Sequence, residues 1–133
     1  MTGACPILTG REALLPMLPP DPTGNPLGTQ PDTLQLTKDR RTLVVTLRRT
    51  PAQIALVDTH TFNVRIVGIP GHTTTGHHWL SANGKYSFVA VESPAGFAVV
   101  NNRTGDVVAD YTYPNPPGGT RAHGVFFIPR RPR

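Results

Sequence analysis

Short apolar runs alternate with polar, turn-forming stretches along most of this chain. The runs are rich in Val, Ile, Leu, Phe, Tyr and Thr, which suit a pleated and partly buried strand, whereas Gly, Asn, Asp and Pro fill the breaks. The pattern predicts eight strands, at residues 33–37, 42–48, 53–58, 64–69, 77–81, 86–92, 96–101 and 107–113. No amphipathic helix is expected, so the predicted fold class is all-β.

The predicted strands fall into two similar halves. Residues 36–47 align with residues 80–91 at an offset of 44, and residues 50–64 align with residues 93–107 at an offset of 43. Six of the fifteen pairs in the second alignment are identical, and most of the others exchange similar residues. The one-residue slip between the alignments falls in a loop, where changes of length are tolerated. Each half is therefore interpreted as one four-stranded unit of a repeat.

This repeat divides the chain into four parts. Residues 1–30 are proline-rich, match neither unit and are interpreted as an irregular arm. Residues 31–70 and 71–113 are the two units. Residues 114–133 hold the start of a further unit and a basic tail.

The units resemble the blades of YVTN-type β-propeller repeats. Residues 36–45 are similar to the family's motif S-P-D-G-(R/K)-x-(L/Y)-(Y/V)-V, and residues 54–61 and 97–105 are similar to its segment (V/I)-x-V-(I/V)-D-(T/x)-x-T-G. Residues 122–125, Ala-His-Gly-Val, resemble the P-H-G-(V/I) that opens many of its blades. Arg40 and Phe62 stand where the family usually has glycine, and Asn101 where aspartate is common. The resemblance covers about residues 31–129 and implies four-stranded antiparallel propeller blades in a partial propeller.

The number of units raises a physical difficulty. Propellers close with roughly four to eight blades, whereas the sequence supplies two units and one opening strand. Two isolated blades leave two apolar faces uncovered, and such faces tend to associate. Two explanations remain open: the chain is the C-terminal fragment of a longer YVTN-like protein, or several copies assemble. The expected partners are accordingly the missing blades or further copies of the chain.

Composition and charge narrow the classes of function. The net charge of +5 comes from 11 Arg and 2 Lys against 8 acidic residues, but the basic residues are spread along the chain, so nucleic-acid binding is not expected. No apolar run approaches the about 20 residues that a membrane-spanning helix requires. The single cysteine, Cys5, excludes an intrachain disulfide. YVTN-like proteins are often exported, but the start of the chain shows no signal peptide, so the compartment stays open.

Histidines and arginines are the candidate ligand-binding residues. His72, His77 and His78 fall within seven positions, and His123 opens the further unit. Neighbours on a strand point to opposite sides, so only His77 or His78 could join His72 and His123 around a metal. No further ligand completes such a site, so no metal is predicted, and the histidines are interpreted as loop hydrogen-bonding residues and a channel-facing polar residue. Loops on the same face as His72 are expected to contribute Glu92 and several arginines. The candidates for binding a ligand are His72, His77, His78, Arg121, His123, Arg48 and Arg49.

The common catalytic motifs are absent from the sequence. It contains no G-x-S-x-G, H-E-x-x-H or P-loop motif, and no catalytic residue or cofactor is predicted. Asp58 and Asn101 are interpreted as turn caps, and Trp79 as packing against a neighbouring blade. The expected function is a non-enzymatic propeller module that binds a protein or a small polar ligand through loops on one face. The alternative is a fragment of a lactonase-like propeller enzyme, although none of that family's catalytic residues can be placed on this sequence.

Overall fold

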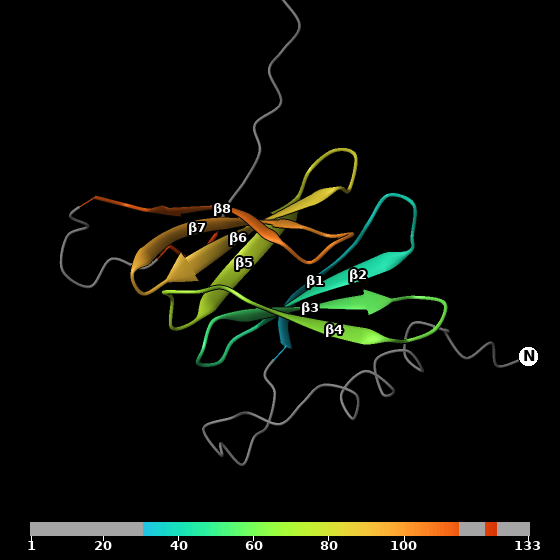
Figure 1. The fold of residues 1–133 in the computed structure, drawn as a ribbon, viewed down its shortest axis with the longest axis horizontal. Coiled ribbons are helices and arrows are strands. Elements are labelled where there is room, and N and C mark those ends of the chain that lie inside the picture. Colours follow the sequence, from blue (N-terminus) through green and yellow to red (C-terminus); the bar gives the residue numbers. More distant parts are fainter. Residues whose placement is uncertain (1–30, 115–121, 125–133) are drawn as a thin grey trace, which may run out of the picture.

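Two four-stranded antiparallel sheets make up the described part of the chain (Figure 1). The computed structural model describes residues 31–114 and 122–124. Sheet A contains β1 (Pro31–Leu36), β2 (Thr42–Leu47), β3 (Gln53–Asp58) and β4 (Val64–Gly68). Sheet B contains β5 (Thr75–Leu80), β6 (Tyr86–Glu92), β7 (Ala95–Asn101) and β8 (Val107–Thr112). The all-β prediction is confirmed for these residues, and each predicted strand end lies within two residues of the observed one.

Each sheet is a meander in which successive strands pair through short turns. The order is β1-β2-β3-β4 in sheet A and β5-β6-β7-β8 in sheet B. A register irregularity occurs at the start of the β1–β2 pairing and at the same place in the β5–β6 pairing. No helix in the described part of the chain is long and apolar enough to cross a membrane.

The β1–β2 and β5–β6 turns are built alike. In the first turn, the Asp39 carboxylate accepts hydrogen bonds from the Thr37 hydroxyl at 2.7 Å and from the N–H of Arg41 at 3.0 Å. In the second, the Asn83 side-chain oxygen accepts from the Ser81 hydroxyl at 2.8 Å and from the N–H two residues later at 3.0 Å. These side chains satisfy backbone donors that the tight turn leaves without strand partners.

The β3–β4 and β7–β8 turns form a second matching pair. The Asp58 carboxylate accepts hydrogen bonds at 2.8 Å from the N–H groups of both His60 and Thr61. Asn101 accepts from the corresponding N–H groups in sheet B, at 3.0 and 3.4 Å. Asp58 and Asn101 are therefore turn caps, as the sequence predicts.

All four of these turns contain a residue with positive φ. Sheet B has glycine there, Gly84 at 71° and Gly105 at 79°, whereas sheet A has Arg40 at 59° and Phe62 at 58°. These are the positions at which the resemblance expects glycine. A side-chain-bearing residue in this left-handed region costs roughly 1–2 kcal/mol. The two turns of sheet A therefore adopt the left-handed conformation without the glycine that favours it.

The main hydrophobic core lies between the two sheets. Alternation along each strand directs every second side chain toward the other sheet. The buried residues of this core come from both sheets: Val44, Ala52, Ile54, Leu56, Val67, Ile69, Val89, Val91, Ala98 and Val100. A second cluster forms on the other face of sheet A, from Val45, Leu47, Ala55 and Val57.

Aromatic side chains occupy the face of sheet B that points away from sheet A. The rings of Phe97 and Tyr111 lie 5.5 Å apart, and those of Tyr111 and Tyr113 lie 5.6 Å apart. Tyr111 is 47% exposed and Trp79 is 39% exposed. We call this surface the far face of sheet B.

Candidate functional site

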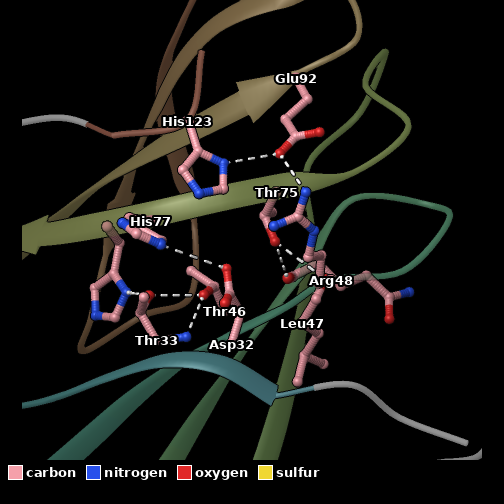
Figure 2. A network of polar contacts seen from close by, with 11 residues as sticks. Asp32, Thr33, Thr46, Leu47, Arg48, Thr75, His77, Glu92 and His123 are labelled. Carbon is pink, nitrogen blue, oxygen red and sulfur yellow. Dashed lines mark hydrogen bonds and ion pairs between the residues drawn. The ribbon is translucent and has the colours of Figure 1, made fainter. Parts of the chain in front are cut away.

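Five ionisable side chains gather where β1, β2, β5 and β6 come together (Figure 2). Asp32 lies on β1, His77 on β5 and Glu92 at the end of β6, while Arg48 follows β2 and His123 belongs to the segment 122–124. β5 packs against both β1 and β2, which brings residues of the two sheets to one place. We call these five residues the polar cluster.

Glu92 is the buried centre of the polar cluster. It is 3% exposed, and its Oε1 accepts a hydrogen bond from Arg48 Nη2 at 3.2 Å. The same oxygen lies 3.2 Å from His123 Nδ1. Because an ionised carboxylate only accepts hydrogen bonds, this His123 nitrogen is the donor. A buried carboxylate is thus joined to two side chains that remain partly exposed, 41% for Arg48 and 51% for His123.

His77 extends the cluster from His123 to Asp32. The two imidazole rings lie 4.4 Å apart, and the backbone N–H of His77 donates to the carbonyl of His123 at 2.7 Å. On its other side, His77 Nε2 is 3.9 Å from Asp32 Oδ2. That carboxylate oxygen is buried and has no hydrogen-bond partner among the described residues. The cluster therefore retains a buried acceptor beside an imidazole.

His78 lies beneath the cluster, between the two sheets. It is 3% exposed, and its Nδ1 is 2.9 Å from the hydroxyl of Thr33, which is 2.8 Å from the hydroxyl of Thr46. Burial, and to a smaller extent the nearby charge of His77, lowers the pKa of His78 to about 4. His78 is therefore neutral at pH 7. It is buried against Thr33 beneath the polar cluster and is not exposed to solvent.

His72 takes part in a different set of contacts. Its side chain is buried, with Nδ1 at 2.9 Å from the Pro94 carbonyl and Nε2 at 2.9 Å from Asp110 Oδ1. These bonds fasten the β4–β5 loop to the β6–β7 turn and to β8. The structure thus places His72 in hydrogen bonds of the β4–β5 loop, with its ring directed toward β8.

The arginine candidates have three different placements. Arg48 belongs to the polar cluster. Arg49 is 5% exposed, and its guanidinium donates to Gln53 Oε1 from Nε at 2.9 Å and also from Nη2. Arg49 thus braces the β2–β3 turn. Arg121 lies outside the described residues.

Sequence reasoning named four of the five cluster residues but missed Asp32. In the sequence it is one carboxylate at the edge of a predicted strand, and the position 44 residues later is Gly76, so the repeat gives no sign of a role. Its approach to His77 depends on the packing of sheet A against sheet B. Only the structure reveals that contact.

The polar cluster offers several kinds of hydrogen-bonding group within one small region. The guanidinium supplies donors, the carboxylates supply acceptors, and each neutral imidazole supplies one donor and one acceptor. Among the described residues, no group of three or more His, Cys, Asp or Glu side chains is placed to hold a metal ion. The arrangement suits recognition of a polar organic ligand.

Comparison of the chain with protein-family models, with curated proteins and with solved structures gave no match.

Proposed function

We propose that this chain is a non-enzymatic β-propeller module of the YVTN type, in which sheets A and B are consecutive blades. Further blades come from additional sequence or from other copies of the chain. The polar cluster, at the end of the sheets where β1 and β5 begin, binds a small polar ligand or a protein.

The observation that carries this proposal is the way the sheets stack. Sheet A packs on sheet B through the face that contains Val44 and Leu56. The corresponding positions, 44 and 43 residues later, are Phe88 and Val99, which pair across β6 and β7 on the far face of sheet B beside Trp79. The far face of sheet B is therefore equivalent to the face of sheet A that packs against sheet B.

The other face of sheet A likewise has an equivalent face on sheet B. Its buried apolar residues come from β2 and β3: Val45, Leu47, Ala55 and Val57. Their counterparts at the same offsets are residues by which sheet B packs on sheet A: Val89, Val91, Ala98 and Val100. Stacking in which one face always meets the opposite face is heterologous, and it closes into a ring when the rotation between units permits. This supports propeller blades in preference to a symmetric sandwich.

Substitutions on the far face of sheet B test whether the blades assemble through this surface. Tyr111→Glu places a charge on its exposed aromatic surface, whereas Thr112→Glu places the same charge on the next residue of β8, whose side chain points to the other side. We expect light scattering coupled to size exclusion to find a discrete assembly for the wild type and Thr112→Glu, and its loss in Tyr111→Glu. A folded wild-type monomer of 14.4 kDa would refute assembly through this face.

Ligand binding at the polar cluster has its own test. Wild type and an Arg48→Gln variant are screened against a library of small polar metabolites by ligand-detected NMR. We expect at least one compound to bind the wild type, with binding lost in Arg48→Gln and retained in Lys38→Gln, which changes an exposed turn residue at the opposite end of the sheets. Hits that bind all three proteins equally would place the ligand elsewhere.

The second candidate is a lactonase-like propeller enzyme, and the contact between Glu92 and His123 favours it. A buried carboxylate hydrogen-bonded to a partly exposed imidazole can orient that ring as a general base. Lactone hydrolysis by the purified chain, lost in both Glu92→Gln and His123→Gln, would establish this alternative. Absence of turnover above background would leave the binding module.

A further inference from the structure

A groove opens between the sheets at the end opposite to the polar cluster. It has a volume of about 1210 Å³ and is lined by the β1–β2, β3–β4, β5–β6 and β7–β8 turns. On the side of β1 and β5, the β1–β2 and β5–β6 turns touch, since a Cβ added to Gly84 would lie 3.3 Å from Thr37 Cβ. The two contacting turns therefore close the groove on that side.

Arg65 bounds the groove on the side of β4 and β8. Its Nη1 donates to the carbonyl of Arg103 at 3.2 Å and to that of Thr104 at 2.8 Å, so the side chain of β4 reaches across to the β7–β8 turn. Between the two boundaries, Asn102 is 7% exposed and donates to the Gly84 carbonyl at 2.9 Å. Its Oδ1 accepts from the Ser87 hydroxyl at 2.6 Å. These bonds fix the wall that sheet B contributes.

The wall contributed by sheet A is balanced in charge. It carries two cations, Arg41 and Arg65, and two carboxylates, Asp39 and Asp58. A hydrogen bond from the Thr37 hydroxyl lowers the pKa of Asp39, and backbone N–H bonds lower the pKa of Asp58. Both carboxylates consequently stay ionised at neutral pH and offset the two cations.

The wall contributed by sheet B is cationic. Lys85 and Arg103 line it, and the turn positions that hold carboxylates in sheet A are occupied by the neutral amides Asn83 and Asn101. The amides accept the same turn hydrogen bonds as the carboxylates they replace. The described lining residues of sheet B thus keep the turn geometry without any negative charge.

Lys85 and Arg103 are held on adjacent turns. The N–H of Asn102 donates to the Lys85 carbonyl at 2.9 Å, which ties the β7–β8 turn to the β5–β6 turn. Lys85 Nζ lies 5.1 Å from the centroid of the Tyr86 ring, a contact that orients its side chain. A compact point charge and a planar guanidinium on adjacent turns of one wall are complementary to an anion with more than one charged group.

We propose that this groove binds a small multivalent anion, for which a diphosphate group is the simplest model, with Lys85 and Arg103 as its principal contacts. The site lies at the other end of the sheets from the polar cluster and does not depend on the function proposed for that cluster. The two sheets together form it, since sheet A supplies Arg65 and the opposite wall.

The test is calorimetric titration of pyrophosphate, without divalent cations, into the full chain. We expect binding that weakens as salt rises, because exposed charges interact through a screened field. Asn83→Asp and Asn101→Asp give the turns of sheet B the carboxylates of sheet A while preserving an acceptor for each turn bond. Each should weaken binding about tenfold, since a new negative charge in the lining repels a multivalent anion through high-dielectric solvent.

Charge-matched variants make the result specific. Lys85→Gln and Arg103→Gln should also weaken binding about tenfold, whereas Lys38→Gln removes the same charge from an exposed turn residue outside the lining and should change the Kd less than about twofold. Asp58→Asn should tighten binding. Circular dichroism confirms that each variant is folded. No binding to the wild type, or an equal effect of Lys38→Gln and Lys85→Gln, would overturn the proposal.

Discussion

Acidification should destabilise the fold through His78, because this imidazole is buried in its neutral form. Its folded pKa of about 4 lies below the ordinary value of 6.5. As pH falls through 6.5 the unfolded chain takes up a proton at this residue, whereas the folded chain does not until pH approaches 4. The stabilisation is therefore complete above pH 6.5 and is lost progressively between pH 6.5 and 4. Between pH 7 and pH 5 the loss is about 2 kcal/mol.

The variant His78→Leu isolates this contribution. Leu34 occupies the matching position in sheet A, opposite Val45 as His78 is opposite Val89, so leucine suits the local strand geometry. Other titrating groups act equally in both proteins. The free energy of unfolding of the variant should therefore fall by about 2 kcal/mol less than that of the wild type between pH 7 and pH 5.

Urea denaturation at pH 7, 6 and 5, followed by far-ultraviolet circular dichroism at one fixed protein concentration, measures this difference. His60→Gln is the control, since it removes an exposed imidazole from the β3–β4 turn and should leave the pH dependence unchanged. Equal pH dependence in the wild type and His78→Leu would refute the placement of a neutral imidazole between the sheets.

Three further substitutions test other parts of the fold by chemical denaturation. Phe62→Gly should stabilise the protein by about 1 kcal/mol, because glycine accepts the positive φ that the turn imposes, whereas His60→Gly beside it should not stabilise. Ile54→Ala should destabilise by about 2–5 kcal/mol by leaving a cavity between the sheets, while Val108→Ala, at an exposed position, should stay within about 0.5 kcal/mol. His72→Ala should destabilise by about 1–3 kcal/mol by leaving the Pro94 carbonyl without its donor, and should not change the zinc or copper content measured by mass spectrometry.

Local patterns allowed the strands and turns to be predicted from the sequence. Alternation and β-branched residues place β3 and β6 at the bounds observed, and the acceptor side chains of Asp58 and Asn101 indicate their turns. Arg40 and Phe62 were identified as departures because the resemblance implies glycine at these positions, and both residues have positive φ in the structure.

The candidate site was less predictable because it depends on contacts between sheets. His72 reaches Asp110 on β8 because of the local course of the β4–β5 loop. Asp32 reaches His77 only through the packing of β1 against β5. Neither contact follows from spacing along the chain, since both depend on side-chain directions set by tertiary packing.

The ion pair between Arg48 and Glu92 has a consequence for the symmetry of the molecule. The two residues hold the same position in successive units, 44 residues apart, yet they contact each other at 3.2 Å. Two identical units would bring like charges together there and repel. The units can meet at this point only because they carry opposite charges, so sheets A and B are not interchangeable. Their difference at one position gives the stack a direction.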